Sequence, residues 1–401
     1  MTSERKAVLL ENISEVSKPI FESNGIECEI LPGALSEDEL IEKLQGVKFL
    51  GLRSATNLTR KVFENCPDLV AAGAYSIGTN QIDLEAASEY GVAVFNAPFS
   101  NGRSVVELII GEIVALYRHL SDRNRSLQAG IWDKTASGSF EVRGKTLGIV
   151  GYGKIGTQLS VLAEAMGLRV LFYDILERPA LGNAKAVASL SELLEQSDIV
   201  TLHVDGRDDN RGFFGESDFE KMRPGSLFLN ASRGFVVDYD ALKSHLESGQ
   251  IAGAAIDVYE KEPKKRGDKF THILQGIDNV ILTPHIGGST LEAQRSIGDF
   301  VSHKLVDYYK MGSTALSVNM PNIQLVPTTS KARIMHIHKN VPGVLMQVNQ
   351  ILSEEGANIE AQWLSTRGKI GYVVTDLNSE VPEHLKERLR TFGETIYVRG
   401  Q

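Results

Sequence analysis

The sequence has few cysteines, no excess of basic residues and no long apolar run. Only Cys28 and Cys66 occur among 401 residues, without a CxxC pair, so neither a disulfide scaffold nor a metal site is expected. Lysine and arginine total 42 against 51 acidic residues, a net charge of -9, which argues against a nucleic acid or an anionic membrane as the main partner. An anionic small substrate stays open, because a few cations can dominate inside a cleft.

The lack of long apolar runs also indicates where in the cell the protein is expected. The amino terminus MTSERKAVLLENIS is too polar for a signal peptide, and no stretch approaches the roughly 18 apolar residues that a spanning helix needs. Hydrophobic residues make up 42% and charged residues 23%, as in ordinary soluble domains. We expect a soluble, cytoplasmic protein of two or three domains.

Short apolar segments alternate with helical segments in two series. The first lies within residues 1–100, where SEDELIEKLQG opens with the Ser36 and Glu39 spacing of a capping box. The second series runs from KTLGIVGYG to NVILTPH, and long helical patterns cover residues 104–130 and 289–312. Strands that alternate with helices indicate parallel sheets covered on both faces.

The last part of the chain has a different order of elements. Residues 317–330 contain two prolines and little periodicity, which indicates a linker. Beyond it the pattern is strand, helix, strand, strand, helix, strand, the order of a ferredoxin-like βαββαβ unit.

The stretch GIVGYGKIG contains the glycines of a dinucleotide-binding turn, Gly151, Gly153 and Gly156. Such a pattern alone is a weak signal, but here a strand enters it and an amphipathic helix leaves it. The next strand ends at Asp174, about twenty residues further on, where a carboxylate would bind ribose hydroxyls and repel a 2′-phosphate. The sequence therefore predicts an NAD site.

Three further stretches end strands of the second series: LFLNASRG, IDVYEKEP and LTPHIGG. They supply Arg233, Glu262 and His285, and loops at strand carboxyl ends form ligand crevices in such sheets. Oxidation of a 2-hydroxy acid would need a base such as His285, a carboxylate partner such as Glu262, and a planar cation such as Arg233 for the substrate carboxylate. Taken singly, each residue also fits a structural or solvated role.

Together these motifs resemble those of the D-isomer-specific 2-hydroxyacid dehydrogenases. The likeness rests on GIVGYGKIG, NASRG, AAIDVYEKEP and TPHIGGST, and extends through RSATNLT, AGAYSIGTNQIDL and NAPFSNGRSVVELIIGEI. It implies two doubly wound α/β domains and a tail. A Rossmann-like nucleotide domain (101–289) would be inserted into a flavodoxin-like substrate domain (1–100 and 290–325), and a ferredoxin-like ACT domain would cover residues 330–401.

The resemblance assigns roles to individual residues. Arg233, Glu262 and His285 become the catalytic set. The implied cofactor contacts are Gly151, Gly153, Lys154, Ile155, Gly156, Asp174, Ala231, Ser232, Arg233, Asp257, His285, Ile286, Gly287 and Gly288. The implied substrate contacts are Arg53, Ser54, Asn101, Arg233 and Lys134.

The tail, with HIHKNVPGVL followed by GANIEAQ, resembles an ACT domain, a small-molecule regulatory module. In serine-sensitive relatives, residues that match His338, Asn340 and Asn358 bind the amino acid between tails of paired subunits. The resemblance therefore implies L-serine as effector and a homotetramer joined through the tails. A tail that only joins subunits is the alternative.

The resemblance implies NAD-dependent oxidation of 3-phospho-D-glycerate to 3-phosphohydroxypyruvate, the first step of L-serine biosynthesis, with feedback inhibition by L-serine. Reduction of 2-oxoglutarate is a further activity in relatives. Two alternatives remain: a glyoxylate or hydroxypyruvate reductase, and an NADH-sensing corepressor that binds proteins.

Overall fold

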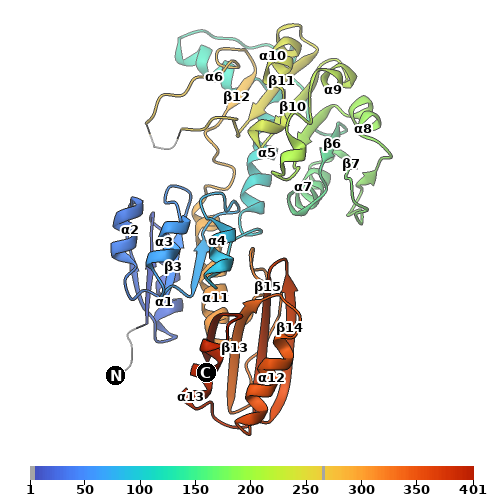
Figure 1. The fold of residues 1–401 in the computed structure, drawn as a ribbon. Coiled ribbons are helices and arrows are strands. Elements are labelled where there is room, and N and C mark those ends of the chain that lie inside the picture. Colours follow the sequence, from blue (N-terminus) through green and yellow to red (C-terminus); the bar gives the residue numbers. More distant parts are fainter. Residues whose placement is uncertain (1–4, 264–266) are drawn as a thin grey trace. The chain divides into compact units, whose positions relative to one another are not determined.

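The computed structural model describes residues 5–263 and 267–401 (Figure 1). It divides into two compact units: Met1–Ser100 with Gln294–Gln401, and Asn101–Ala293. The chain thus leaves the first unit after residue 100 and returns to it at residue 294. The assignment of substrate binding and effector binding to particular parts of the chain remains a prediction. Among the described residues, no helix has the length and apolarity needed to cross a bilayer.

The first unit contains a five-stranded parallel sheet with the order β2-β1-β3-β4-β5, as in flavodoxin-like folds. Apart from the edge strand β2, its short strands are almost wholly buried, because apolar clusters cover both faces. The strands are β1 (Lys6–Leu9), β2 (Glu27–Ile30), β3 (Phe49–Leu52), β4 (Ala71–Ala74) and β5 (Ala93–Phe95). The helices are α1 (Ser17–Glu22), α2 (Glu37–Lys43), α3 (Arg60–Asn65), α4 (Leu84–Glu89) and α11 (Leu291–Met311).

Local sequence signals fix where these helices begin and end. The Ser36 N–H donates to Glu39 Oε2 at 2.8 Å, so the predicted capping box forms at the start of α2. Asp83 accepts from the Ala86 N–H at 2.9 Å and caps α4. Gly46 follows α2 with a φ of +73°, a left-handed conformation that glycine adopts without strain.

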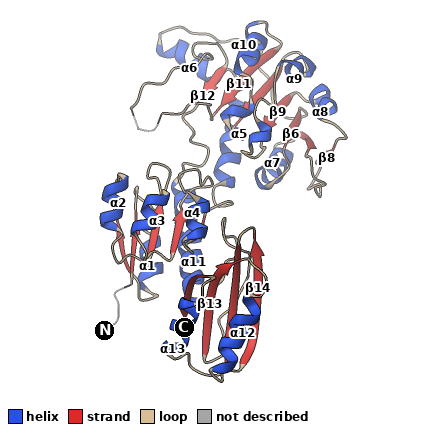
Figure 2. Cartoon of the chain, viewed as in Figure 1, coloured by secondary structure: helices blue, strands red, loops and turns tan. Residues whose placement is uncertain are grey.

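The second unit is built on a seven-stranded parallel sheet with the order β12-β11-β10-β9-β6-β7-β8. The strand order reverses beside β6, the switch point at which such sheets bind ligands. Figure 2 shows the sheet between its helices. The strands are β6 (Thr146–Val150), β7 (Arg169–Tyr173), β8 (Lys185–Ala186), β9 (Ile199–Leu202), β10 (Ser226–Asn230), β11 (Ile251–Ile256) and β12 (Val280–Leu282). The helices are α5 (Gly102–Tyr117), α6 (Leu120–Gln128), α7 (Lys154–Ala165), α8 (Leu190–Gln196), α9 (Glu216–Lys221) and α10 (Tyr239–Glu247), with short 3-10 turns η1 (Asp208–Asn210) and η2 (Gly234–Val236).

The helical pattern over residues 104–130 is two helices rather than one. The chain breaks between α5 and α6 at His119, which has a φ of +47°. Its Nε2 lies 3.0 Å from the carbonyl oxygen of Gly138, so a contact with a later loop holds the break.

The tail forms the predicted βαββαβ unit, with an antiparallel sheet in the order β14-β15-β13-β16. Two helices cover one face and enclose a separate apolar cluster. Its elements are β13 (Ala332–Lys339), α12 (Val344–Glu354), β14 (Ile359–Arg367), β15 (Ile370–Leu377), α13 (Glu383–Thr391) and β16 (Thr395–Gly400). The expected fold class is confirmed: two doubly wound sheets and a ferredoxin-like tail.

The other face of the tail sheet shares a core with the five-stranded sheet. Met335, Ile337 and Tyr372 belong to the same apolar cluster as Phe95 and Tyr308. The predicted linker lacks regular structure but is fixed as well. Within it, the Ile323 N–H donates to Thr314 Oγ1 at 2.9 Å, and the side chains of Met320 and Leu325 are buried.

A buried ion pair lies within the tail, and its arginine also binds the segment before the tail. Arg333 donates from Nε and Nη2 to the two carboxylate oxygens of Asp376, at 2.6 and 2.8 Å. Its Nη1 donates to the carbonyl oxygens of Met311 and Val326, both at 2.9 Å. Because the pair is bidentate and its remaining donor is satisfied, the pKa of Asp376 is lowered even though burial opposes ionisation.

We predict that Arg333→Met destabilises the tail by about 3–5 kcal/mol, because it leaves a buried carboxylate without its counter-charge. Urea unfolding followed by Trp363 fluorescence reports this directly, since the Arg333 guanidinium lies 5.5 Å from the Trp363 ring. A Trp132→Phe background removes the second tryptophan. The double variant Arg333→Met with Asp376→Leu should recover most of the loss. Equal midpoints for single variant and parent would contradict this account.

Candidate active site

The three glycines of the turn after β6 each meet a different requirement. Gly151 has a φ of +92°, and a Cβ there would lie 2.7 Å from the carbonyl oxygen of His203. A Cβ on Gly156 would lie 2.5 Å from the Gly151 oxygen, so a larger residue would push α7 off the turn. Gly153, the N-cap of α7, has open space where its Cβ would be. The first N–H groups of α7, from Lys154 and Ile155 onward, can therefore be approached closely by a pyrophosphate.

Asp174 stands directly after β7, where the sequence predicted it. Its Oδ2 accepts from the Tyr152 N–H at 2.9 Å, and its Oδ1 accepts from the Leu176 N–H at 2.8 Å. The carboxylate lines the same pocket as Gly151 and Gly153. A fixed anion beside the glycine turn suits ribose hydroxyls and disfavours a 2′-phosphate, so the residues fit NAD.

The segment after β9 supplies pocket residues that the sequence reasoning did not single out: His203, Val204, Asp205 and Arg207. Burial lowers the pKa of His203 to about 4, so its imidazole is uncharged at neutral pH. The ring Nε2 lies 3.0 Å from Thr201 Oγ1. The only sequence signal was the strand IVTLHV, which ends at the same sheet edge as the glycine turn.

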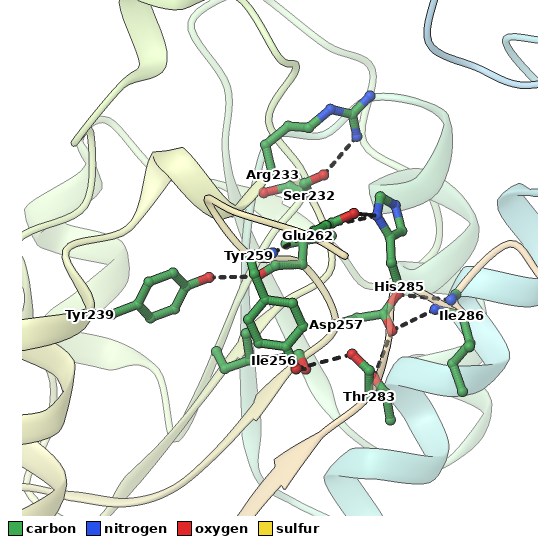
Figure 3. Close-up of polar contacts among 12 residues, drawn as sticks. Ser232, Arg233, Tyr239, Ile256, Asp257, Tyr259, Glu262, Thr283, His285 and Ile286 are labelled. Carbon is green, nitrogen blue, oxygen red and sulfur yellow. Dashed lines mark hydrogen bonds and ion pairs between the residues drawn. The ribbon is translucent and has the colours of Figure 1, made fainter. Parts of the chain in front are cut away.

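His285 and Glu262 form a hydrogen-bonded pair beyond the ends of β12 and β11 (Figure 3). His285 Nδ1 lies 2.8 Å from Glu262 Oε2 and 3.0 Å from Oε1. The Tyr259 N–H also donates to Glu262 Oε1, at 3.1 Å, so the carboxylate is oriented from two sides. Both side chains keep some exposure, 48% for His285 and 34% for Glu262, which leaves the imidazole within reach of a ligand.

The electrostatics of the pair favour a charged histidine. The hydrogen bond to Glu262 raises the pKa of His285 and outweighs the opposing effect of burial. For Glu262, burial is the largest effect and works against ionisation, but the hydrogen bond and charge of His285, the Tyr259 N–H and the Arg233 charge together lower the pKa. Arg233 contributes to both groups: it disfavours the imidazolium and favours the carboxylate. The predicted catalytic set therefore shares one electrostatic environment.

Asp257 holds the segment that carries the histidine. Its Oδ1 accepts from Thr283 Oγ1 at 2.6 Å and from the Ile286 N–H at 2.8 Å, and its Oδ2 accepts from the Gly287 N–H at 2.8 Å. His285 adopts a φ of +53°, which is rare for a residue with a side chain. The carboxylate is thus satisfied by the chain itself. Its predicted contact with the cofactor stays a prediction.

Glu112 on α5 is a second buried carboxyl group that the sequence reasoning missed. Burial, with a smaller contribution from Asp257, raises its pKa to about 8, so it is mainly protonated at neutral pH. Its Oε1 has no hydrogen-bond partner among the described residues. The position of Glu112 within ELIIGEIV gave no sign that it faces the sheet rather than solvent.

The loop after β10 presents Arg233. Asn230 orders this loop, because its Oδ1 accepts from the Ser232 N–H at 3.0 Å and its Nδ2 donates to the Arg233 carbonyl at 3.1 Å. Gly234 packs directly on the Tyr259 backbone, where no Cβ would fit. Only Nη1 of the guanidinium makes a hydrogen bond among the described residues, to the Ser232 carbonyl at 2.7 Å.

The predicted substrate residues are not all gathered here. Asn101 touches Gly288, where a Cβ would collide with its amide, so it adjoins the histidine loop. Lys134 lines a different hollow, with Arg118, Arg123 and Trp132. Arg53 and Ser54 belong to the first unit, in the loop after β3. Their roles stay predictions.

The predicted effector residues lie at two ends of the tail sheet. His338 pairs in register with Gly371, whereas Asn358 precedes β14 at the end where Ile359, Leu377 and Ala332 align. Six residues of β13 separate these ends, about 20 Å at 3.3 Å per residue. His338 Nε2 is buried without a partner among the described residues, and Asn340 Nδ2 donates to the Gly368 carbonyl at 3.0 Å. One tail alone does not bring the three residues together.

Comparisons with known proteins cover both units. Residues 110–287 match the family model described as D-isomer specific 2-hydroxyacid dehydrogenase, NAD binding domain, and residues 334–397 match the AHAS small subunit-like ACT domain. The chain is 47% identical over 397 residues to D-3-phosphoglycerate dehydrogenase of Escherichia coli K12, covering 98% of this chain and 97% of that protein. It is 48% identical over 394 residues to D-3-phosphoglycerate dehydrogenase of Dictyostelium discoideum, covering 98% and 96%.

A solved structure of D-2-hydroxyisocaproate dehydrogenase is also similar, with a TM-score of 0.72 and 27% identity. It covers 78% of this chain and 99% of that one.

We predict that Glu262→Gln shifts the pH profile of catalysis. In the parent, the raised pKa of His285 means that its imidazole becomes neutral only at higher pH. Because alcohol oxidation needs the neutral imidazole as base, its rate should increase as pH rises through that pKa. Without the carboxylate this pKa falls, and the profiles of oxidation and reduction both move to lower pH. We also expect kcat to fall by about 10²-fold, because the imidazolium loses its partner.

Initial rates in both directions between pH 5 and 10 measure this effect. Glu260→Gln, which neutralises an exposed carboxylate two residues away, is the control and should keep the parental profile. An unchanged profile for Glu262→Gln would show that the pair does not set the pKa of the base.

Proposed function

The chain belongs to the D-isomer specific 2-hydroxyacid dehydrogenases, and from this membership we propose that it oxidises 3-phospho-D-glycerate to 3-phosphohydroxypyruvate, the first step of L-serine biosynthesis. As a member it is an NAD-dependent dehydrogenase, and its tail is an ACT domain. Relatives named D-3-phosphoglycerate dehydrogenase that match 98% of the chain support the choice of substrate. The structural observation that carries the chemistry is the His285–Glu262 hydrogen bond.

The chain's own residues perform the proton transfer. Bound NAD supplies the acceptor for the hydride that leaves the substrate carbon. With its Nδ1 proton directed at Glu262, neutral His285 takes the hydroxyl proton at Nε2, and the carboxylate stabilises the imidazolium that results. In the reverse direction the same nitrogen returns the proton to the carbonyl oxygen.

Arg233 suits the substrate carboxylate and the reacting oxygen, because its planar guanidinium still has donors to offer. We assign the remaining anionic groups of the substrate to Arg53, Ser54, Asn101 and Lys134. Reduction of 2-oxoglutarate belongs to the same proposal, since that substrate has the same 2-oxo acid group and a second carboxylate where phosphohydroxypyruvate has its phosphate.

Two other functions use the same scaffold. A glyoxylate or hydroxypyruvate reductase would share the catalytic set, but relatives that match through the ACT tail favour the phosphorylated substrate. A corepressor that senses NADH would not need His285 and Glu262 to be paired. We also propose the cytoplasm as the compartment, which the two unpaired buried thiols of Cys28 and Cys66 support.

We predict that phosphohydroxypyruvate is reduced with a kcat/KM at least about 100-fold above those for glyoxylate and hydroxypyruvate. A cation that meets the phosphate contributes about 1.5–3 kcal/mol through each charged hydrogen bond. NADH absorbance followed with these three oxoacids and 2-oxoglutarate in parallel gives the ratios. A preference for glyoxylate would favour the reductase, and negligible turnover of all four would favour the binding protein.

L-Serine is the proposed effector, bound where two tails meet. The unpartnered, buried Nε2 of His338 supports a polar ligand near the end of β13. Strand β14 is an edge of the tail sheet, with Leu364 and Trp363 45% and 37% exposed, which supports pairing with a second tail and hence a homotetramer. In one tail, Asn358 lies at the opposite end of the sheet from His338. A second tail would supply its own Asn358 to complete the site.

We predict that L-serine binds and inhibits the enzyme, and that Asn358→Ala weakens both effects about tenfold or more through lost hydrogen bonds to a charged ligand. Asn358 suits the test because it is exposed. Calorimetry and rate assays measure the two effects, with D-serine as the control ligand. A parent enzyme that neither binds nor responds to L-serine would leave the tail as a joining module.

A further inference from the structure

The loop that carries Arg53 and Ser54 is fixed by a carboxylate from another strand. Glu11, two residues after β1, accepts three consecutive backbone N–H groups of this loop. Its Oε2 accepts from Ser54 at 3.1 Å and from Ala55 at 3.0 Å, and its Oε1 accepts from Thr56 at 2.9 Å. Three donors in a row on one carboxylate form an anion-binding concavity that the chain fills with its own side chain.

The segment that carries Glu11 is strained, and the residues after β2 hold it. Glu11 and Asn12 have φ values of +62° and +53°, conformations that residues with side chains rarely adopt. The Glu11 N–H donates to the Gly33 carbonyl and the Asn12 N–H to the Leu31 carbonyl, both at 3.2 Å. Strain of this kind persists where the surroundings impose it, and it concentrates at functional sites.

Arg53 is held from a second direction. Gln81 Nε2 donates to its carbonyl oxygen, so the residue is fixed at its own carbonyl and at the amides that follow. The guanidinium itself has no hydrogen-bond or ion-pair partner among the described residues, and it is half-buried. The loop also leaves β3 at the carboxyl edge of a parallel sheet, where ligands of such folds bind. Arg53 is therefore a fixed cation that is available to bind an anionic ligand.

We infer that Glu11 is a positioning residue for substrate binding: its carboxylate fixes the loop of residues 53–56 so that Arg53 and Ser54 meet the anionic substrate in a prepared geometry. The inference rests on the proposed function, which assigns these two residues to the substrate. A carboxylate is required because it offers only acceptors to three donors, whereas an amide would turn an NH₂ group toward one of them.

The expected effect of Glu11→Gln is a selective loss of substrate affinity. The KM for phosphohydroxypyruvate should rise about tenfold, while kcat and the KM for NADH stay within about twofold of the parent. Glu15→Gln is the matched control, because it neutralises an exposed carboxylate on the same segment. Gln81→Ala removes the other restraint on Arg53 and should raise the same KM, which keeps the test informative if Glu11→Gln folds poorly.

A double-mutant cycle with Arg53→Ala separates positioning from general damage. If Glu11 acts through Arg53, then Glu11→Gln adds less than about twofold to the KM of the Arg53→Ala enzyme. The same tenfold rise in both backgrounds, or a joint loss of kcat and NADH affinity, would overturn the inference. So would a parental KM for Glu11→Gln.

Failure of the proposed function is recognised separately, in the parent enzyme. A parent that reduces only glyoxylate or hydroxypyruvate would refute the proposed substrate, and the same cycle measured with that oxoacid would then judge Glu11. A parent that turns over phosphohydroxypyruvate while Glu11→Gln behaves identically would refute the positioning role alone.

Discussion

The geometry of the candidate active site depends on the carboxylate of Asp257. Three donors from one short segment, Thr283 Oγ1 and the N–H groups of Ile286 and Gly287, converge on it. Asp257 is 2% exposed, so water does not compete for these bonds, and they can maintain the left-handed backbone of His285 between them. The segment held in this way carries the imidazole that meets Glu262.

Much of the fold and part of the site follow from the sequence. The apolar runs of β6 and β10 and the spacing of Gly151, Gly153 and Gly156 are local signals, because each reflects the conformation of its own segment. Arg233, Glu262 and His285 could be grouped because strand ends of a parallel sheet meet at one edge. No tertiary contact between these three residues had to be known in order to group them.

Other features could not be read from the sequence because they depend on contacts between distant segments. His119 breaks a continuous helical pattern through a conformation that its sequence neighbours do not signal. His203 and Glu112 each look like one polar residue in an apolar run. The segment before the tail looked like a loose linker, yet Met320 and Leu325 are buried in a core shared by the tail and the five-stranded sheet. That shared core restricts movement of the tail relative to the five-stranded sheet.

One device recurs at the strand ends. Asp174 accepts backbone N–H groups from Tyr152 and Leu176, Asp257 from the histidine loop, and Glu11 from residues 54–56. In each case the carboxylate accepts at least two main-chain N–H groups, and Asp174 forms an ion pair with Arg178 at 3.6 Å as well. Arg53, in the loop that Glu11 holds, and Arg233, in the loop that Asn230 holds, form no ion pair with a carboxylate within the described chain. An acidic protein can in this way present positive charge to an anionic ligand, because Glu11 and Asn230 fix the loops of Arg53 and Arg233 without pairing with the guanidinium groups.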